Sequence, residues 1–465
     1  MTKRSDFQDF MDQKKPNPLE MPPLPQQQPT LRRALGVTDA AALIIGICIG
    51  AGIYSTPQII AGYQSSFRTI ILLWLVMGGL VFIHGLMYSE LGTRLPHSGG
   101  DYVYISRSFG PFAGFMFGWA QLLIIRTSSV AGLALITADY IGFFVPMDKF
   151  TRMVVALLVI ALLGSLNYVG IKQASFYQKI SSLLKVSGLF ALIAIGLILM
   201  HRHVNLLWTE VPPTATLGPL GNFITPLMLI FFTYGGYVRV GQVAEEIKKP
   251  RRDIPRSLIT SLSIIILLYI LINTVYHRLL GIEGMRGSTI VASDVATLLI
   301  GPAGAGLITI LVIISTTSGL NANTMSSTRV YYAMAKDGLL FKWLDYIHPK
   351  FRTPSRAILV HCFWASVILL IKGNFETIIT GKVFINFIFY SLGALAFFRL
   401  REKKIGEKNS FRVPWYPVLP ALYLIGLLGL IIFRLIFEFE KSVLDIAFVA
   451  SGIPFYFFWS RRSNK

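Results

Sequence analysis

Two glycine-rich stretches interrupt apolar segments that would otherwise form continuous helices. The first, "IIGICIGAGIYSTP", covers residues 44–57, and the second, "FFTYGGYVRV", covers residues 231–240. Glycine is a weaker helix former than alanine by about 1 kcal/mol, and proline lacks the N–H donor. Each stretch is therefore predicted to break its helix and to leave backbone N–H and C=O groups without helical partners.

Broken helices inside a membrane expose backbone groups that can bind a charged ligand. Such groups are tolerated there only where they line a cavity or hold a ligand. N–H groups at the start of a half-helix favour a carboxylate, and unpaired carbonyls opposite them favour an ammonium group. A pair of breaks therefore suits an α-amino acid zwitterion. Close helix packing explains either glycine cluster alone, but two clusters at matching places favour the site.

A lysine within the fifth apolar segment, Lys185, is a further candidate for chemistry. An intramembrane lysine costs about 2.5–3.5 kcal/mol on insertion scales. Lys179 suits snorkelling to the surface, but Lys185 lies about 9 Å deeper by helical rise. We therefore expect a functional cation there. Arg126 and Arg239 also fall within apolar segments, and we interpret both as structural pairing residues.

The elements that position these residues are membrane helices. The chain has 465 residues, of which 54% are hydrophobic and 14% charged. Apolar runs recur at close to the ~20 residues that a helix needs to cross a bilayer. The sequence predicts an all-α polytopic protein with twelve spans, at residues 39–61, 69–91, 111–141, 152–168, 177–200, 222–243, 257–280, 303–328, 357–372, 378–398, 415–437 and 443–459.

The two breaks open two blocks of five spans each. Blocks at residues 39–200 and 222–398, each beginning with a glycine-interrupted span, are the pattern of inverted-repeat transporters. Two extra helices follow at 415–459. The segment "SDVATLLIGPAG" is expected to form a re-entrant or surface helix on the outer side. We expect residues 1–38 to be a disordered cytoplasmic tail and 461–465 a cytoplasmic C-terminus.

The net charge of +20 is explained by topology. Most of the 43 lysines and arginines fall on one side of the predicted spans, and Lys382 is counted with the outer loops. This positive-inside bias places both termini in the cytoplasm and argues against nucleic-acid binding. Cys48 and Cys362 are the only cysteines, too few for a disulfide framework or a metal cluster. The sequence indicates no cofactor, no metal and no cleaved signal peptide.

Several segments, spread over residues 31–460, resemble one family of membrane proteins. They are "GICIGAGIYSTP", "ELGTRLPHSGGDYVYISRSFGPFAGFMFGWAQLLIIRTSS", "FFTYGGY", "VAEEIKKPRRDIP", "NANTMSSTRVYYAMAKDGLLF" and "SGIPFYFFW". Together they resemble the amino acid–polyamine–organocation superfamily, and most closely its L-type amino acid transporter family. The resemblance implies a twelve-span inverted-repeat fold that moves amino acids by alternating access, usually without sodium and often by exchange.

The resemblance also implies a substrate site on the two breaks. Main-chain N–H groups would hold the carboxylate, carbonyl groups would receive the amino group, and Phe232 would act as a lid. The implied substrate-binding residues are Cys48, Ile49, Gly50, Ala51, Gly52, Ile53, Phe232, Thr233 and Gly235. Ala51, Thr233 and Tyr237 depart from the residues usual in the family, so the side-chain preference stays open.

The resemblance gives Lys185 a role in coupling. In this family, a fifth-span lysine takes the place of the sodium ion of sodium-coupled relatives and ties span one to span eight. Tyr276 and Ser326 are possible supporting residues, although sodium binding by the span-eight hydroxyls is not expected. The loop at 145–151 lacks a cysteine, so no disulfide-linked heavy-chain partner is expected.

The function expected is that of a sodium-independent amino acid exchanger in the plasma (inner) membrane, as a monomer or weak homo-oligomer. Two alternatives stay open. One is proton-coupled symport with Lys185 as the proton carrier, and the other is a transporter-like membrane sensor. An enzyme is not expected, because the spans carry no His–carboxylate cluster and no zinc motif.

Overall fold

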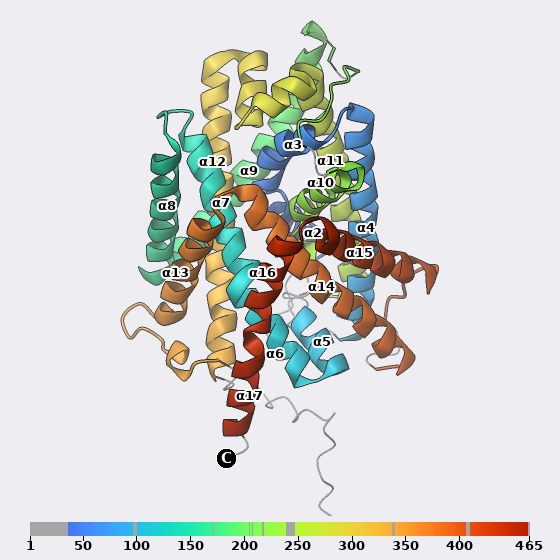
Figure 1. Cartoon of the computed structure of the whole chain (residues 1–465), viewed down its shortest axis with the longest axis vertical. Helices are drawn as coiled ribbons and strands as arrows, with labels where there is room; N and C mark the ends of the chain where they lie inside the picture. Colours follow the sequence, from blue (N-terminus) through green and yellow to red (C-terminus); the bar gives the residue numbers. More distant parts are fainter. Residues whose placement is uncertain are drawn as a thin grey trace, which may run out of the picture.

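The computed structural model describes residues 36–95, 100–169, 171–203, 205–206, 208–215, 218–238, 247–336, 340–405 and 410–463. Their regular elements are all helices, which confirms the predicted all-α class. Figure 1 shows these helices as a bundle with α2 and α3 near its centre and α17 projecting from one end. The helices are α2 (Val37–Cys48), α3 (Gly52–Tyr63), α4 (Phe67–Arg94), α5 (Asp101–Phe109), α6 (Pro111–Ala120), η1 (Gln121–Ile125), α7 (Arg126–Ile141), α8 (Lys149–Val169), α9 (Ile171–Leu199), η2 (Met200–Arg202), α10 (Gly218–Tyr234), α11 (Pro250–Gly287), α12 (Val291–Lys336), η5 (Lys342–Asp345), α13 (Ser355–Lys372), α14 (Phe375–Glu402), α15 (Val418–Phe437), α16 (Phe439–Ala450) and α17 (Gly452–Ser463).

Most of these helices are long and apolar enough to span a bilayer. Ten described helical stretches meet that condition, and the bent pair α2–α3 brings the number to eleven. The helix α10 adds a shorter apolar segment, Leu220–Tyr234. The predicted sixth span, 222–243, extends into residues 239–246, which lie outside the described residues, together with Arg239. The count of twelve spans therefore stays a prediction.

Both predicted helix breaks are present. The helices α2 and α3 meet at a bend of 47°, with the unwound residues 49–51 between them. The helix α10 ends at Tyr234, and a turn follows at Gly235 and Gly236. Gly236 has a φ of 130°, a backbone conformation that only glycine adopts without strain. The breaks therefore occur where the local residue types predict them.

Two helices extend well beyond their predicted spans. The helices α11 and α12 were expected at 257–280 and 303–328, but each continues through a glycine with positive φ. These glycines are Gly281 (φ 65°) and Gly301 (φ 77°). A glycine at such an angle redirects the chain without ending the helix pattern. The segment "SDVATLLIGPAG" accordingly forms the first part of α12 as far as the bend, a helix as expected.

The connection between α13 and α14 is short and strongly defined. Gly373 ends α13 in the left-handed conformation, with φ 69°. The side chain of Asn374 then caps α14 by accepting a hydrogen bond from the Thr377 N–H at 2.8 Å. Such caps stabilise a helix start by about 1 kcal/mol. The first turns of α14 are thus fixed in place.

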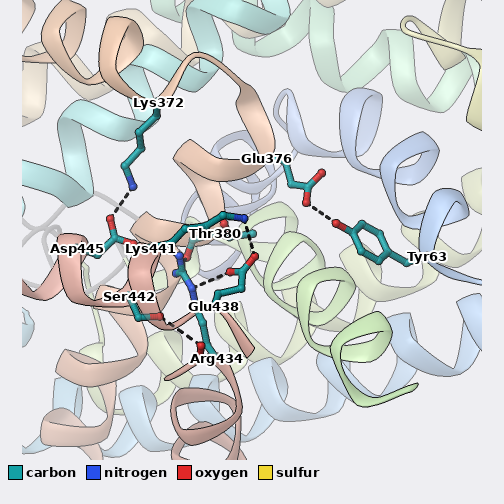
Figure 2. A network of polar contacts seen from close by, with 9 residues as sticks. All are labelled: Tyr63, Lys372, Glu376, Thr380, Arg434, Glu438, Lys441, Ser442 and Asp445. Carbon is teal, nitrogen blue, oxygen red and sulfur yellow. Dashed lines mark hydrogen bonds and ion pairs between the residues drawn. The ribbon is translucent and has the colours of Figure 1, made fainter. Parts of the chain in front are cut away.

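Buried ion pairs join α14 to α13, α15 and α16 (Figure 2). Asp445 accepts from Lys372 Nζ at 2.6 Å and from Arg434 Nη2 at 3.1 Å. Arg434 also pairs with Glu438 at 3.1 Å and donates to the carbonyl of Thr380 on α14. Arg434 and Asp445 are 1% and 0% exposed. Buried charges are costly unless paired in this way, so the network locks the four helices together.

A second buried carboxylate ties the other end of α14. Glu90 on α4 is fully buried and pairs with Arg94 at 2.9 Å and with Arg401 at 3.1 Å. It also accepts from the backbone N–H of Val413 at 2.8 Å. The helix α14 is therefore held near both ends, by different partners.

Candidate functional site

A cavity of about 220 Å³ lies between the two helix breaks. Residues of both breaks contribute to its wall, and the remaining wall comes from α5, α6, α7, α9, α12 and α14. The polar and charged side chains in the wall are Asp101, Tyr102, Gln121, Arg126, Ser129, Lys185, Thr233, Tyr237, Asn323, Ser327, Tyr331, Lys382, Asn386 and Tyr390. Asp101 is the single carboxylate among the lining residues. The cavity is thus large enough for a small polar ligand and rich in groups that bind one.

The two breaks pack directly against each other. A Cβ atom added to Gly52, at the start of α3, would lie 2.8 Å from the Cα and Oγ1 atoms of Thr233. The Thr56 hydroxyl donates to the carbonyl of Gly52 at 2.9 Å and lies 3.0 Å from the Thr233 hydroxyl. On the other side of the break, a Cβ atom at Gly236 would lie 2.9 Å from Ile47 Cγ2. Glycine is required here because the backbones approach so closely.

Tyr269 on α11 connects both breaks and was not singled out from the sequence. Its phenol oxygen lies 2.9 Å from the carbonyl oxygen of Cys48 and 3.1 Å from that of Thr233. The side chain is fully buried. The available signal was a tyrosine in an otherwise apolar segment, "IIILLYILIN", and that pattern does not reveal which residues the tyrosine contacts.

Most of the predicted substrate-binding residues line the cavity. They are Cys48, Gly50, Ala51, Gly52, Phe232, Thr233 and Gly235. Ile49 and Ile53 are fully buried and do not line it. The roles assigned to all of them stay predictions.

Lys185 also lines the cavity, from the side of α9. Its side chain is 3% exposed. The helix α9 packs against α12 and against α2, so Lys185 occupies the region where these three helices meet. Tyr276 is fully buried, and Ser326 donates to the carbonyl of Asn323 at 3.3 Å. Neither of these two lines the cavity.

The predicted lid, Phe232, is held by α14. Its ring packs edge-on against Phe375, with centroids 5.8 Å apart. The ammonium group of Lys382 lies 4.6 Å from the centroid of the same ring. Counting Lys382 with the outer loops was wrong, since it lies inside α14 and lines the cavity. The predicted start of the tenth span was close to Lys382, so the hydropathy pattern did not separate loop from helix there.

The helix through α6 and α7 contains a π-helical segment, η1, at the cavity wall. The extra residue places Arg126 Nε 2.8 Å from Gln121 Oε1, five residues earlier. Arg126 was expected to pair with backbone or with a carboxylate, and its partner is instead this amide. Single π-turns occur frequently at functional sites because they reorient side chains.

Asp101, in the first turn of α5, faces Arg126 across the cavity wall. Its Oδ1 atom is buried and has no hydrogen-bond partner among the described residues. Burial raises the pKa of Asp101 to about 7, and the charge of Arg126 only partly opposes that rise. The Asp101 carboxyl therefore changes its charge near neutral pH.

Comparison with known proteins agrees with this geometry. The serine/threonine exchanger SteT of Bacillus subtilis (strain 168) is 29% identical over 439 residues, covering 93% of this chain and 98% of that protein. The human large neutral amino acids transporter small subunit 2 is 28% identical over 448 residues, covering 93% and 82%. The mouse Asc-type amino acid transporter 1 is 27% identical over 443 residues, covering 92% and 82%. Residues 35–458 match the family described as amino acid permease, and with its broken helices around a polar cavity the chain belongs to that family.

Proposed function

We propose that the protein is a sodium-independent amino acid exchanger that works by alternating access. The observation that carries this proposal is the cavity between the two helix breaks, with Lys185 buried in its wall. The N–H groups at the start of α3 suit a substrate carboxylate, because a half-helix N-terminus favours negative charge. The carbonyl groups of Cys48, Phe232 and Gly235 suit the ammonium group.

Lys185 supplies a permanent positive charge at the junction of α2, α9 and α12. A bound sodium ion at the same junction would be repelled by that charge. The lysine thus replaces a metal cation in holding the broken helix, which accounts for transport without sodium. The proposed site needs no cofactor, and we propose that the chain acts in the plasma membrane with its termini in the cytoplasm and without a disulfide-linked partner.

Counterflow in proteoliposomes tests the proposal. The purified protein is reconstituted with and without internal unlabelled amino acids, and uptake of labelled serine, leucine and glutamate is followed in sodium-free buffer. We expect uptake only into vesicles that contain internal amino acid, and no increase on adding sodium. Uptake into empty vesicles driven by an inward proton gradient would instead establish symport. Absence of uptake for every amino acid would contradict the proposal.

Asp101 supports proton-coupled symport as the second candidate, because its pKa is close to neutral and it lines the cavity. The carboxyl is neutral below that pKa and charged above it. Asp101→Asn holds the side chain neutral at every pH, so its transport rate is expected to lose the pH dependence and to match the low-pH wild-type level. The control is Asp148→Asn, since Asp148 is exposed and hydrogen bonds from Thr151 lower its pKa. Identical pH profiles for wild type and Asp101→Asn would exclude a proton role for this residue.

A further inference from the structure

One cation in the cavity wall is not required by the proposed exchange of zwitterions. Lys382 lies on the face of α14 that also carries Asn386 and Tyr390, at the spacing of successive helical turns. All three line the cavity. Lys382 therefore belongs to the part of the wall that meets the substrate beside its lid, Phe232, at a distance of 4.6 Å between the ammonium group and the ring centroid.

The opposite face of α14 is immobilised by Arg434 (Figure 2). The Arg434 guanidinium donates to the carbonyl of Thr380 and lies 4.8 Å from the ring centroid of Phe384. These two residues come two positions before and two positions after Lys382. Glu376, one turn earlier than Thr380, accepts from the Tyr63 hydroxyl of α3 at 2.5 Å. The backbone that carries Lys382 is thus held rigidly, as a specificity-determining residue requires.

The charges of the cavity wall do not balance. Arg126, Lys185 and Lys382 are cationic, and Asp101 is the single acidic lining residue. Arg126 lies beside Gln121 and Asp101, and Lys185 lies at the junction of α2, α9 and α12. A zwitterion adds no net charge, so it leaves the positive charge of Lys382 uncompensated. An amino acid with an acidic side chain supplies the missing negative charge.

The contact of Lys382 with the lid is one that a carboxylate can displace. A cation over an aromatic ring gains about 0.5–2 kcal/mol, whereas a hydrogen bond between ionised groups contributes about 1.5–3 kcal/mol. We propose that Lys382 forms a side-chain subsite for the carboxylate of an acidic amino acid of the glutamate and aspartate class. This inference rests on the proposed amino acid exchange and adds the substrate class to it.

Competition between isosteric amino acids tests the subsite. Glutamate and glutamine differ only in charge and one polar atom, as do aspartate and asparagine. With the wild-type protein, we expect half-inhibition of counterflow at glutamate concentrations about tenfold or more below those of glutamine. Lys382→Met is expected to abolish that preference while glutamine still exchanges, and Lys382→Arg to retain it. Lys350→Met, at an exposed lysine outside the cavity, is the matched control and should keep the wild-type ratio.

The outcomes separate the subsite from the transport function itself. Equal inhibition by glutamate and glutamine in the wild type, or an unchanged ratio in Lys382→Met, overturns the inference and leaves amino acid exchange intact. Exchange of glutamine by Lys382→Met shows that the variant is folded. If no amino acid is exchanged by the wild-type protein, the proposed function fails, and this inference fails with it.

Discussion

Gly52→Ala reduces substrate binding by about 10- to 100-fold, the loss that corresponds to 1–3 kcal/mol of overpacking. The added Cβ atom would lie 2.8 Å from the Cα atom of Thr233, closer than such atoms approach in proteins. A backbone atom cannot turn away as a flexible side chain can. The start of α3 and the end of α10 must therefore separate, and both helix breaks lose the arrangement that presents their backbone groups to the substrate.

A matched control lies in the same broken helix. A Cβ atom at Gly46 on α2 would have no atom within 4 Å, and so Gly46→Ala should bind substrate like the wild type. Equilibrium binding of a labelled amino acid to detergent-purified protein gives the affinity, and size-exclusion chromatography checks the folded state. Equal affinities for Gly52→Ala and the wild type would remove the carboxylate site from the start of α3.

Lys185→Ala is expected to reduce exchange by about 100-fold or more, because it removes a buried cation from the junction of three helices. Losing one member of a buried charged contact costs about 3–5 kcal/mol. We expect the loss mainly in turnover, since the lysine ties α9 to the broken α2 and to α12 rather than forming the whole binding site. Initial rates of counterflow over a range of substrate concentrations separate turnover from affinity.

Lys185→Met keeps most of the side-chain volume and isolates the effect of charge. Lys149→Met, at the exposed start of α8, serves as the control and should exchange at the wild-type rate. Wild-type turnover in Lys185→Ala would reduce this lysine to a residue that merely tolerates burial, and the argument for sodium independence would lose its basis.

The helix breaks could be predicted from the sequence because their causes are local. Glycines at 50, 52, 235 and 236 disfavour the helix wherever they stand, and the structure has both interruptions there. The long continuations of α11 and α12 could not be predicted. Gly281 and Gly301 bend these helices through positive φ, and a sequence does not distinguish such a bend from a helix end.

The cavity wall was predicted only where it consists of the breaks themselves. Tyr269 and Lys382 lie far along the chain from the residues they contact, Cys48 and Phe232. Helical periodicity shows which residues share a face but not which helix that face meets. The contact between Gln121 and Arg126 was missed for another reason, since a spacing of five brings side chains together only in a π-helical turn.

The hydroxyl of Tyr269 has one proton and two carbonyl oxygens within reach. When it donates to Cys48, the Thr233 oxygen lacks that donor, and when it donates to Thr233, the Cys48 oxygen does. At every moment, one of the two breaks has a carbonyl with reduced hydrogen bonding in a dry interior, where an unsatisfied acceptor costs about 1–3 kcal/mol. An arriving ammonium group carries three donors and relieves that deficit. The phenol thus makes the empty site electrostatically frustrated, and an amino acid is the ligand that removes the frustration.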